Sequence, residues 1–221
     1  MKNGSPQVLS VNISVARTLN WRGRSITTGI FKEPVDQPVV VSGDHLEGDE
    51  QADRAVHGGD DKAVYAYSIE DYRWWSCRLH RQLPPGTFGE NLTMQGIGVS
   101  DAVVGERWRV GTAVLEVTQP RLPCYKLGMK MEDTQFVRTF SEGRRPGAYL
   151  RIVEPGIIGA GDSVAVLTRP IHGVTVRDVT EILAVDRGRA AELRDLPGLA
   201  AGLRVWAQTA HLPDDATSPT A

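Results

Sequence analysis

The chain has 221 residues, of which 41% are hydrophobic and 24% charged, and its formal net charge is −2. This composition is typical of a globular protein and argues against a disordered, fibrous or membrane-spanning chain. Because the net charge is so small, any anion site must be created locally, and we expect no nucleic-acid and no membrane partner.

Two cysteines, Cys77 and Cys124, are too few for a disulfide framework or for the four thiolates of an iron–sulfur cluster. The first residues, MKNGSPQVLSVN, contain no sustained apolar run. We therefore expect neither a signal peptide nor a membrane anchor, and we expect a cytoplasmic protein with reduced cysteines.

Short strands are predicted over most of the chain before residue 170. Leu9, Val11, Ile13 and Val15 alternate with polar residues at the two-residue period of a half-buried strand. Further strands are expected at residues 39–41, 63–67, 107–110, 113–118 and 163–167. Many short strands with dense glycine and proline favour a closed or nearly closed β-barrel with one or two inserted helices.

Helices are predicted mainly near the C-terminus. Residues 68–71 and 175–178 each match the capping-box pattern that opens a helix. Two more helices are expected at about 189–195 and 197–209, the latter with Pro197 in its first turn. The predicted fold class is mainly β with α: a β-barrel over 1–168, a small three-helix appendage over 169–212 and a flexible tail over 213–221.

The segment Gln119–Lys126 (QPRLPCYK) is the most informative for chemistry. Two prolines fix the backbone around Arg121 and are expected to exclude regular structure on either side of Cys124. If Arg121 and Lys126 lie near the thiol in space, they favour its thiolate, which attacks electrophiles and binds soft metals. A buried structural cysteine is the alternative, and it is the favoured interpretation of Cys77.

Three other segments could bind a polar ligand. In Asp53–Lys62, the amides of Gly58 and Gly59 could face an anion with His57 and Lys62 beside them, although Gly-Gly-Asp-Asp is also an ordinary turn. Glu90 and Asn91 could hydrogen-bond a ligand or simply orient a loop. Arg145 and Arg151 could form paired hydrogen bonds to phosphate or lie on a solvated turn. The sequence has no zinc spacing, HExxH, GxxxxGK[ST], GxGxxG or GxSxG motif.

Taken together and in order, four segments resemble the MOSC family (molybdenum cofactor sulfurase C-terminal-like domains), in particular its stand-alone YiiM-like branch. The resemblance spans roughly residues 8–167, and the helical remainder is similar to the three-helix appendage of that branch. The segments are Gly29–Pro34 (GIFKEP), residues 53–59 continuing to Ala63–Tyr67, Phe88–Thr93 (FGENLT) and Gln119–Lys126.

The resemblance implies a barrel that binds molybdenum cofactor, a molybdopterin whose dithiolene chelates Mo, with no requirement for pyridoxal phosphate. The family's cysteine matches Cys124, which is implied to be both catalytic and the protein ligand of Mo. The implied activity is an oxidoreductase reaction, the reduction of N-hydroxylated compounds such as hydroxylamino nucleobases. The candidate cofactor-binding residues are Lys32, His57, Gly58, Gly59, Lys62, Glu90, Asn91, Arg121, Lys126, Arg145 and Arg151.

Electrons that restore Mo are expected to come from a separate donor protein, because the chain has no iron–sulfur, flavin or dinucleotide motif. The helices could dock on the barrel or mediate a homodimer. Three alternatives stay open: a carrier that stores the cofactor without turnover, a metal-free thiol enzyme with Cys124 as nucleophile and His57 as base, and a purely structural protein.

Overall fold

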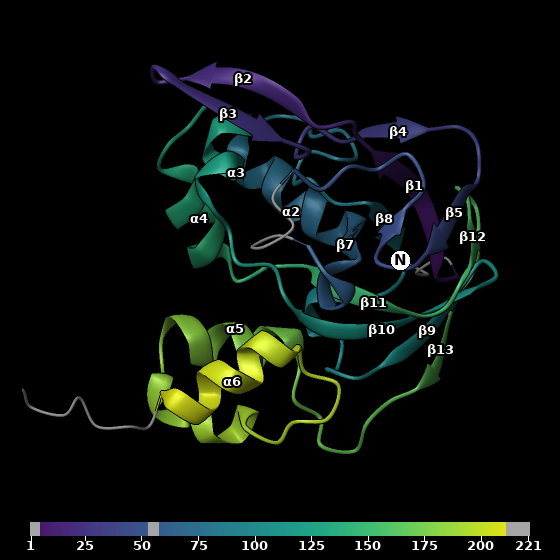
Figure 1. Ribbon diagram of the computed structural model, residues 1–221, viewed down its shortest axis with the longest axis vertical. Coiled ribbons are helices and arrows are strands. Elements are labelled where there is room, and N and C mark those ends of the chain that lie inside the picture. The colour runs from purple at the N-terminus through teal and green to yellow at the C-terminus, as the bar shows by residue number, and fades with distance from the viewer. Residues whose placement is uncertain (1–4, 53–57, 211–221) are drawn as a thin grey trace, which may run out of the picture.

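The computed structural model describes residues 5–52 and 58–210, and an eight-stranded sheet forms its framework (Figure 1). The strand order is β13-β9-β10-β11-β7-β8-β1-β4. All neighbours are antiparallel except β7 and β8, which are parallel. The bounds are β1 Gln7–Ile13, β4 Glu33–Val35, β7 Val64–Ser68, β8 Leu92–Gln95, β9 Arg107–Val110, β10 Ala113–Pro120, β11 Ala148–Glu154 and β13 Val164–Thr168.

Two smaller sheets lie at the periphery. A three-stranded sheet has the order β12-β5-β6, with β12 at Gly156–Ile158, β5 at Val39–Ser42 and β6 at His45–Leu46. A separate hairpin pairs β2 (Arg17–Trp21) with β3 (Arg24–Thr28) and lies along the top of the molecule in Figure 1.

The sheet is not a closed barrel by strand pairing, so this part of the expected fold needs correction. Its edge strands β4 and β13 do not pair with each other within the described residues. A single bridge between Gln7 and Ser163, continued by hydrogen bonds such as Val8 N to the Asp162 carbonyl, instead links the start of β1 to the turn before β13. The fold is a mixed α/β one with a large sheet and several helices.

Strand β1 also departs from the expected alternation. Val8 is fully buried, whereas Val15 is 68% exposed and lies beyond the end of the strand. The register shifts between Val8 and Ser10 where β1 pairs with β8. Such a bulge adds a residue and changes which side chains face the core, so strict alternation predicts the wrong face at one end.

An aromatic cluster joins three helices to one face of the sheet. These helices are α2 (Ile69–Leu79), α3 (Tyr125–Lys130) and α4 (Phe136–Gly143). Trp75 of α2 stacks on Phe140 of α4 with ring centroids 5.6 Å apart, and Phe88 contacts both. Ser68 caps α2 by accepting from Asp71 N, but the reciprocal half of the predicted capping box is not formed, because the Asp71 carboxylate accepts from Ser100 and Arg145. The sequence did not predict α3 and α4.

The C-terminal helices pack on the main core. These are α5 (Val176–Ala184), the 3₁₀ helix η3 (Arg187–Leu193) and α6 (Ala201–Thr209). The predicted capping box at Thr175 is present, with Thr175 and Asp178 bonding each other's backbone amides. Pro197 does not open α6, which begins four residues later, because Gly198 turns the chain with φ +82°. The domain boundaries at 168 and 212 stay predictions, and the predicted tail lies outside the described residues.

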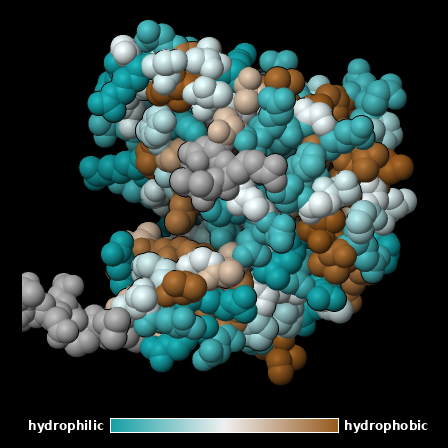
Figure 2. All heavy atoms as spheres, in the orientation of Figure 1, coloured by the Kyte–Doolittle hydropathy of each residue, from teal (hydrophilic) through white to brown (hydrophobic). Residues whose placement is uncertain are grey.

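The surface view shows hydrophilic side chains over most of one face (Figure 2). A notch in that face separates the part that carries α4 from the part that carries α5 and α6 (Figures 1 and 2). In residues 5–52 and 58–210, no helix combines the length and apolar character needed to cross a membrane.

Replacing Thr175 tests the docking of α5. Thr175→Ala removes a capping side chain, so we expect the free energy of unfolding in urea to fall by about 1 kcal/mol. Thr175→Ser keeps the hydroxyl and is the matched control, with a loss well below that of alanine. Equal losses for the two variants would contradict a role for the cap.

Candidate active site

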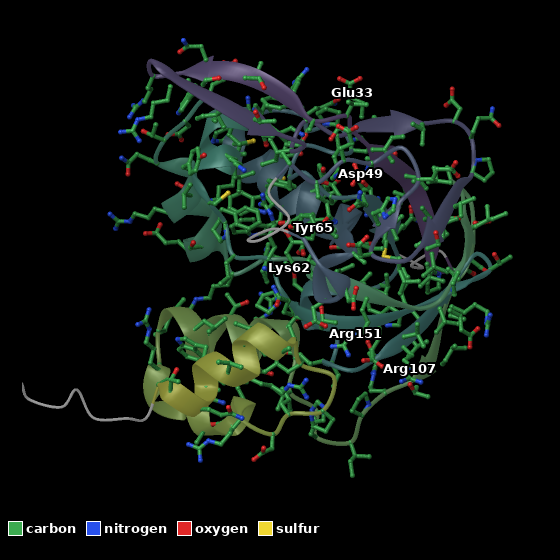
Figure 3. All side chains as sticks on the ribbon, in the orientation of Figure 1. Glu33, Asp49, Lys62, Tyr65, Arg107 and Arg151 are labelled. Carbon is green, nitrogen blue, oxygen red and sulfur yellow. The ribbon has the colours of Figure 1, made fainter. Side chains whose placement is uncertain are left out.

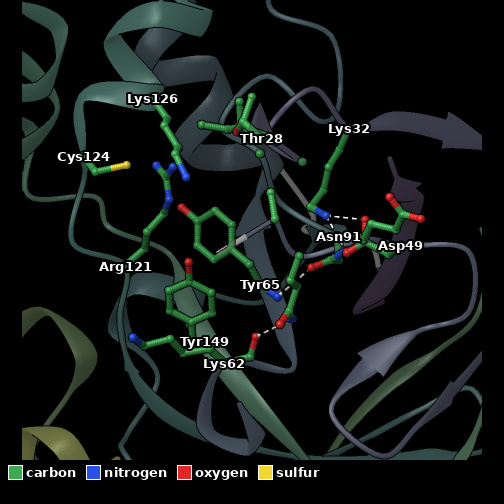
Figure 4. A pocket seen from close by; sticks show the side chains of 16 residues that line it. Thr28, Lys32, Asp49, Lys62, Tyr65, Asn91, Arg121, Cys124, Lys126 and Tyr149 are labelled. Atoms are coloured by element: carbon green, nitrogen blue, oxygen red, sulfur yellow. Dashed lines mark hydrogen bonds and ion pairs between the residues drawn. The ribbon is translucent and has the colours of Figure 1, made fainter. Parts of the chain in front are cut away.

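A pocket opens where the loops at one end of the large sheet converge (Figure 4). It encloses about 610 Å³, including the space at its mouth. Four of its lining residues are cationic and two are acidic, whereas the chain as a whole is slightly acidic. The lining residues are Thr28, Gly29, Ile30, Lys32, Asp49, Glu50, Gln51, Ala52, Lys62, Tyr65, Gly89, Asn91, Arg121, Cys124, Lys126 and Tyr149.

Cys124 reaches the pocket from the short connection between β10 and α3. Strand β10 continues through Pro120 and α3 begins at Tyr125, with Cys124 as its N-cap residue. The expectation that the prolines exclude regular structure on both sides was therefore wrong. Pro120 is the last residue of β10 and pairs with Ala148 of β11. Cys124 has the extended backbone of an N-cap residue, with φ −122° and ψ 172°. The thiol is partly exposed.

Arg121 lies beside Cys124 and is almost fully buried, at 6% exposure. Its guanidinium lies 5.3 Å from the Tyr65 ring centroid and 5.8 Å from that of Phe140. Its Nη1 atom is buried and has no hydrogen-bond partner among the described residues. Burial opposes its charge, but Tyr65, Tyr149 and Cys124 together raise the pKa of Arg121. A charged, incompletely bonded guanidinium in a pocket is a receptor for an anion.

Tyr65 and Tyr149 form the wall next to Arg121. Their rings are 5.1 Å apart between centroids, and Tyr65 donates from its hydroxyl to the Pro146 carbonyl at 2.7 Å. Burial raises the pKa of Tyr65 and of Tyr149, although Arg121 opposes the shift in both. Both phenols therefore stay protonated at neutral pH.

The opposite wall is held by a carboxylate that the sequence did not single out. Asp49 accepts from Lys32 Nζ at 2.6 Å through Oδ2 and from Ser14 N at 2.9 Å. Asn91 donates to the same carboxylate at 2.9 Å and accepts from Tyr65 N at 3.1 Å. Burial lowers the pKa of Lys32 while Asp49 opposes this shift. Asn91 thus holds this wall in position, because both the oxygen and the nitrogen of its side-chain amide form hydrogen bonds within the protein.

The structure brings six predicted residues to this pocket: Lys32, Lys62, Asn91, Arg121, Cys124 and Lys126. Their binding roles stay predictions. Gly58 and Gly59 lie just before the 3₁₀ helix η1 (Asp60–Lys62), outside the lining, with Gly59 at φ +88°. His57 lies outside the described residues. Burial lowers the pKa of Lys62, and Asp61 opposes this shift.

Three predicted residues lie elsewhere. Glu90 is fully buried and accepts from the backbone amides of Gly86 and Phe88, so it organises a loop. Arg145 pairs with Asp71 and lies over the Trp74 ring.

Arg151 pairs with Asp61 and donates to the Gly198 carbonyl. Figure 3 places it toward the C-terminal helices, below Lys62 and Tyr65. Among the described residues, no cluster of three or more His, Cys, Asp or Glu side chains could hold a metal ion.

The comparisons with known proteins identify the family of this chain. The family model of the MOSC domain matches residues 53–165. The Bacillus subtilis protein YflK is 37% identical over 182 residues, covering 82% of each chain. The chain belongs to the MOSC domain family.

Relatives with the YiiM name place it in the YiiM-like branch of this family. Escherichia coli YiiM is 32% identical over 158 residues and 70% of each chain. The crystal structure of YiiM from Geobacillus stearothermophilus superposes with a TM-score of 0.78 and 29% identity, covering 93% of this chain and 98% of that one. A Gibberella moniliformis protein named reductase is 31% identical, over 79% of this chain and 32% of its own length. This family membership supports a function related to molybdenum cofactor.

Lys130 provides a test of the electrostatics beneath the pocket. Its ammonium donates to the carbonyls of Ile30 and Gly86. Burial lowers the pKa of Lys130 to about 8, and although Glu90 opposes this shift, the nearby cations Arg121 and Lys32 add to it. In the unfolded chain, the pKa of Lys130 is near the ordinary 10.5. Between pH 8 and 10.5 the unfolded state therefore binds more protons at Lys130 than the folded state does. Stability from this group therefore rises with pH across that window, by about 1 kcal/mol per pH unit.

We expect Lys130→Met to abolish this rise. The measurement is the free energy of unfolding of both proteins in urea at pH 7.5 and 9.5. Between these two pH values, the stability of the wild type should increase relative to that of Lys130→Met. A difference that stays constant with pH would contradict a lowered pKa in the folded state.

Proposed function

We propose that this protein binds molybdenum cofactor in the Cys124 pocket and reduces N-hydroxylated compounds there. The observation that carries the proposal is the pairing of a partly exposed thiol with a buried guanidinium that lacks a hydrogen-bond partner at Nη1 among the described residues. A soft thiolate suits molybdenum, and an unsatisfied cation suits the anionic tail of a pterin. The residues present therefore fit the group.

Each wall of the pocket has a distinct part in the proposal. Cys124 supplies the protein ligand of Mo, and Arg121 and Lys126 hold the thiolate and the anionic groups of the cofactor. Lys62 adds positive charge from the other side, where Lys32 is already paired with Asp49. When bound, the cofactor supplies the two-electron chemistry that turns an N-hydroxyl group into an amine with loss of water. Tyr65 and Tyr149 keep their protons, because burial raises the pKa of both.

The partners follow from the same proposal. The substrate is a small N-hydroxylated molecule, and the electrons come from a separate donor protein. We further propose a cytoplasmic setting. A homodimer stays a prediction. A carrier that holds the cofactor without turnover would need the same pocket.

The first test uses the two cysteines as a matched pair. Cys77 was expected to be a buried structural cysteine, but it is exposed on α2. It lies outside the pocket, so Cys77→Ala is the control for Cys124→Ala. In protein grown with ample molybdate, we expect Cys124→Ala to lose at least tenfold in bound Mo and in hydroxylamine reduction with an artificial electron donor. Cys77→Ala should keep both.

The outcomes separate the alternatives. Wild-type protein without Mo, and unable to take up the cofactor, would overturn the proposal. Bound Mo without reduction would indicate the carrier. Turnover by Mo-free protein that requires Cys124 would indicate the metal-free thiol enzyme.

A second test asks whether Arg121 serves the ligand or the fold. Arg121→Met replaces a buried cation with an apolar side chain and so removes the cost of desolvating that charge. We expect the cofactor-free variant to unfold at the same or higher urea concentration while its Mo content falls. Arg145→Met is the control and should be destabilised, since it leaves the buried Asp71 carboxylate without its cation. Marked destabilisation by Arg121→Met would show a structural role.

A further inference from the structure

A second hollow adjoins the Cys124 pocket, between the β2–β3 hairpin and helices α3 and α4. Figure 1 shows the hairpin lying above α3. Ile26 lines this groove, and Thr28, two residues along β3, lines the pocket. Side chains two residues apart on a strand face the same side. Tyr125 lines the groove directly after Cys124 lines the pocket, so the two hollows follow one another along β3 and the start of α3.

The groove combines aromatic rings with positive charge. Trp21 and the 54%-exposed Tyr125 supply the rings, and Arg22 and Arg24 supply two guanidinium groups. No acidic residue is among its described lining residues. Aromatic faces stack on planar bases, and arginine pairs with phosphate through parallel hydrogen bonds.

The turn of the hairpin fixes the position of one arginine. Arg22 and Gly23 join Trp21 to its partner Arg24, and both have positive φ, at 53° and 76°. A two-residue turn of this kind favours Asn or Gly, so an arginine at its first position carries local strain. Asn20 Oδ1 accepts from Gly23 N at 3.1 Å and holds the turn. A cation is thus placed at the tip in spite of the backbone preference.

We propose that this groove binds the phosphate and base of a mononucleotide, so that the substrate is an N-hydroxylated nucleotide in preference to a free base. The N-hydroxyl group of this substrate rests on the proposed function, whereas the binding of the nucleotide in the groove is measured separately. From Thr28 to Arg24 the strand advances about 13 Å, which suits a base, sugar and phosphate in line better than a bare base. The base lies toward Cys124, and the phosphate lies at the hairpin tip.

The binding test needs no turnover. Adenosine 5′-monophosphate and adenosine are titrated into the full chain by calorimetry, and we expect the nucleotide to bind at least tenfold more tightly. Arg22→Gln/Arg24→Gln should remove this preference and leave adenosine binding unchanged. Arg138→Gln/Arg204→Gln, on exposed arginines of α4 and α6 outside the groove lining, removes the same number of charges and should keep the preference.

A second variant tests the stacking surface. Tyr125→Ala should weaken both ligands by severalfold, whereas Tyr125→Phe keeps the ring and should match the wild type. Equal binding of nucleotide and nucleoside by the wild type would overturn the inference, as would a preference that survives loss of both arginines. These results are independent of Mo content, so a failure here is distinguishable from a failure of the proposed function.

Discussion

The buried guanidinium of Arg121 is the constraint on which the site depends. A cation that is 6% exposed, with Nη1 lacking a partner among the described residues, has lost its hydration without full replacement. Such a group is unfavourable in an empty pocket and favourable once an anion fills the space. Tyr65 and Phe140 present their ring faces to the cation, and Tyr149 forms a side-chain hydrogen bond with it. The pocket is therefore poised for a negatively charged ligand next to the Cys124 thiol.

The residues around the Arg121 guanidinium come from distant parts of the chain. Strand β10 ends at Pro120 and α3 begins at Tyr125, so the short connection between them presents Arg121 and Cys124 together. Strand β11 pairs with β10 and supplies Tyr149, and the next strand, β7, supplies Tyr65. Asn91 then fastens the far wall by bonding Tyr65 N and Asp49. The C-terminal helices support this end from below, where Ala201 N donates to Asp61.

The sequence predicted the parts of the site that are local in the chain. The segment at Cys124 carries its own signal, since two prolines, two cations and a thiol occur within eight residues. Asp49 and Tyr149 gave no such signal, because their roles arise from pairing across the fold. Arg145 resembled a phosphate ligand but is neutralised by Asp71, a residue 74 positions away. Strand alternation likewise predicted β1 but missed its bulge, and a barrel was expected because turn chemistry does not reveal whether the edge strands pair.

The most direct test of the central claim is a crystal structure of the protein purified with its cofactor. The account predicts Mo bound to Cys124 Sγ and an anionic oxygen of the cofactor within hydrogen-bond distance of Arg121 Nη1. A structure in which Arg121 is instead satisfied by a carboxylate of the protein, with Mo bound away from Cys124, would contradict it.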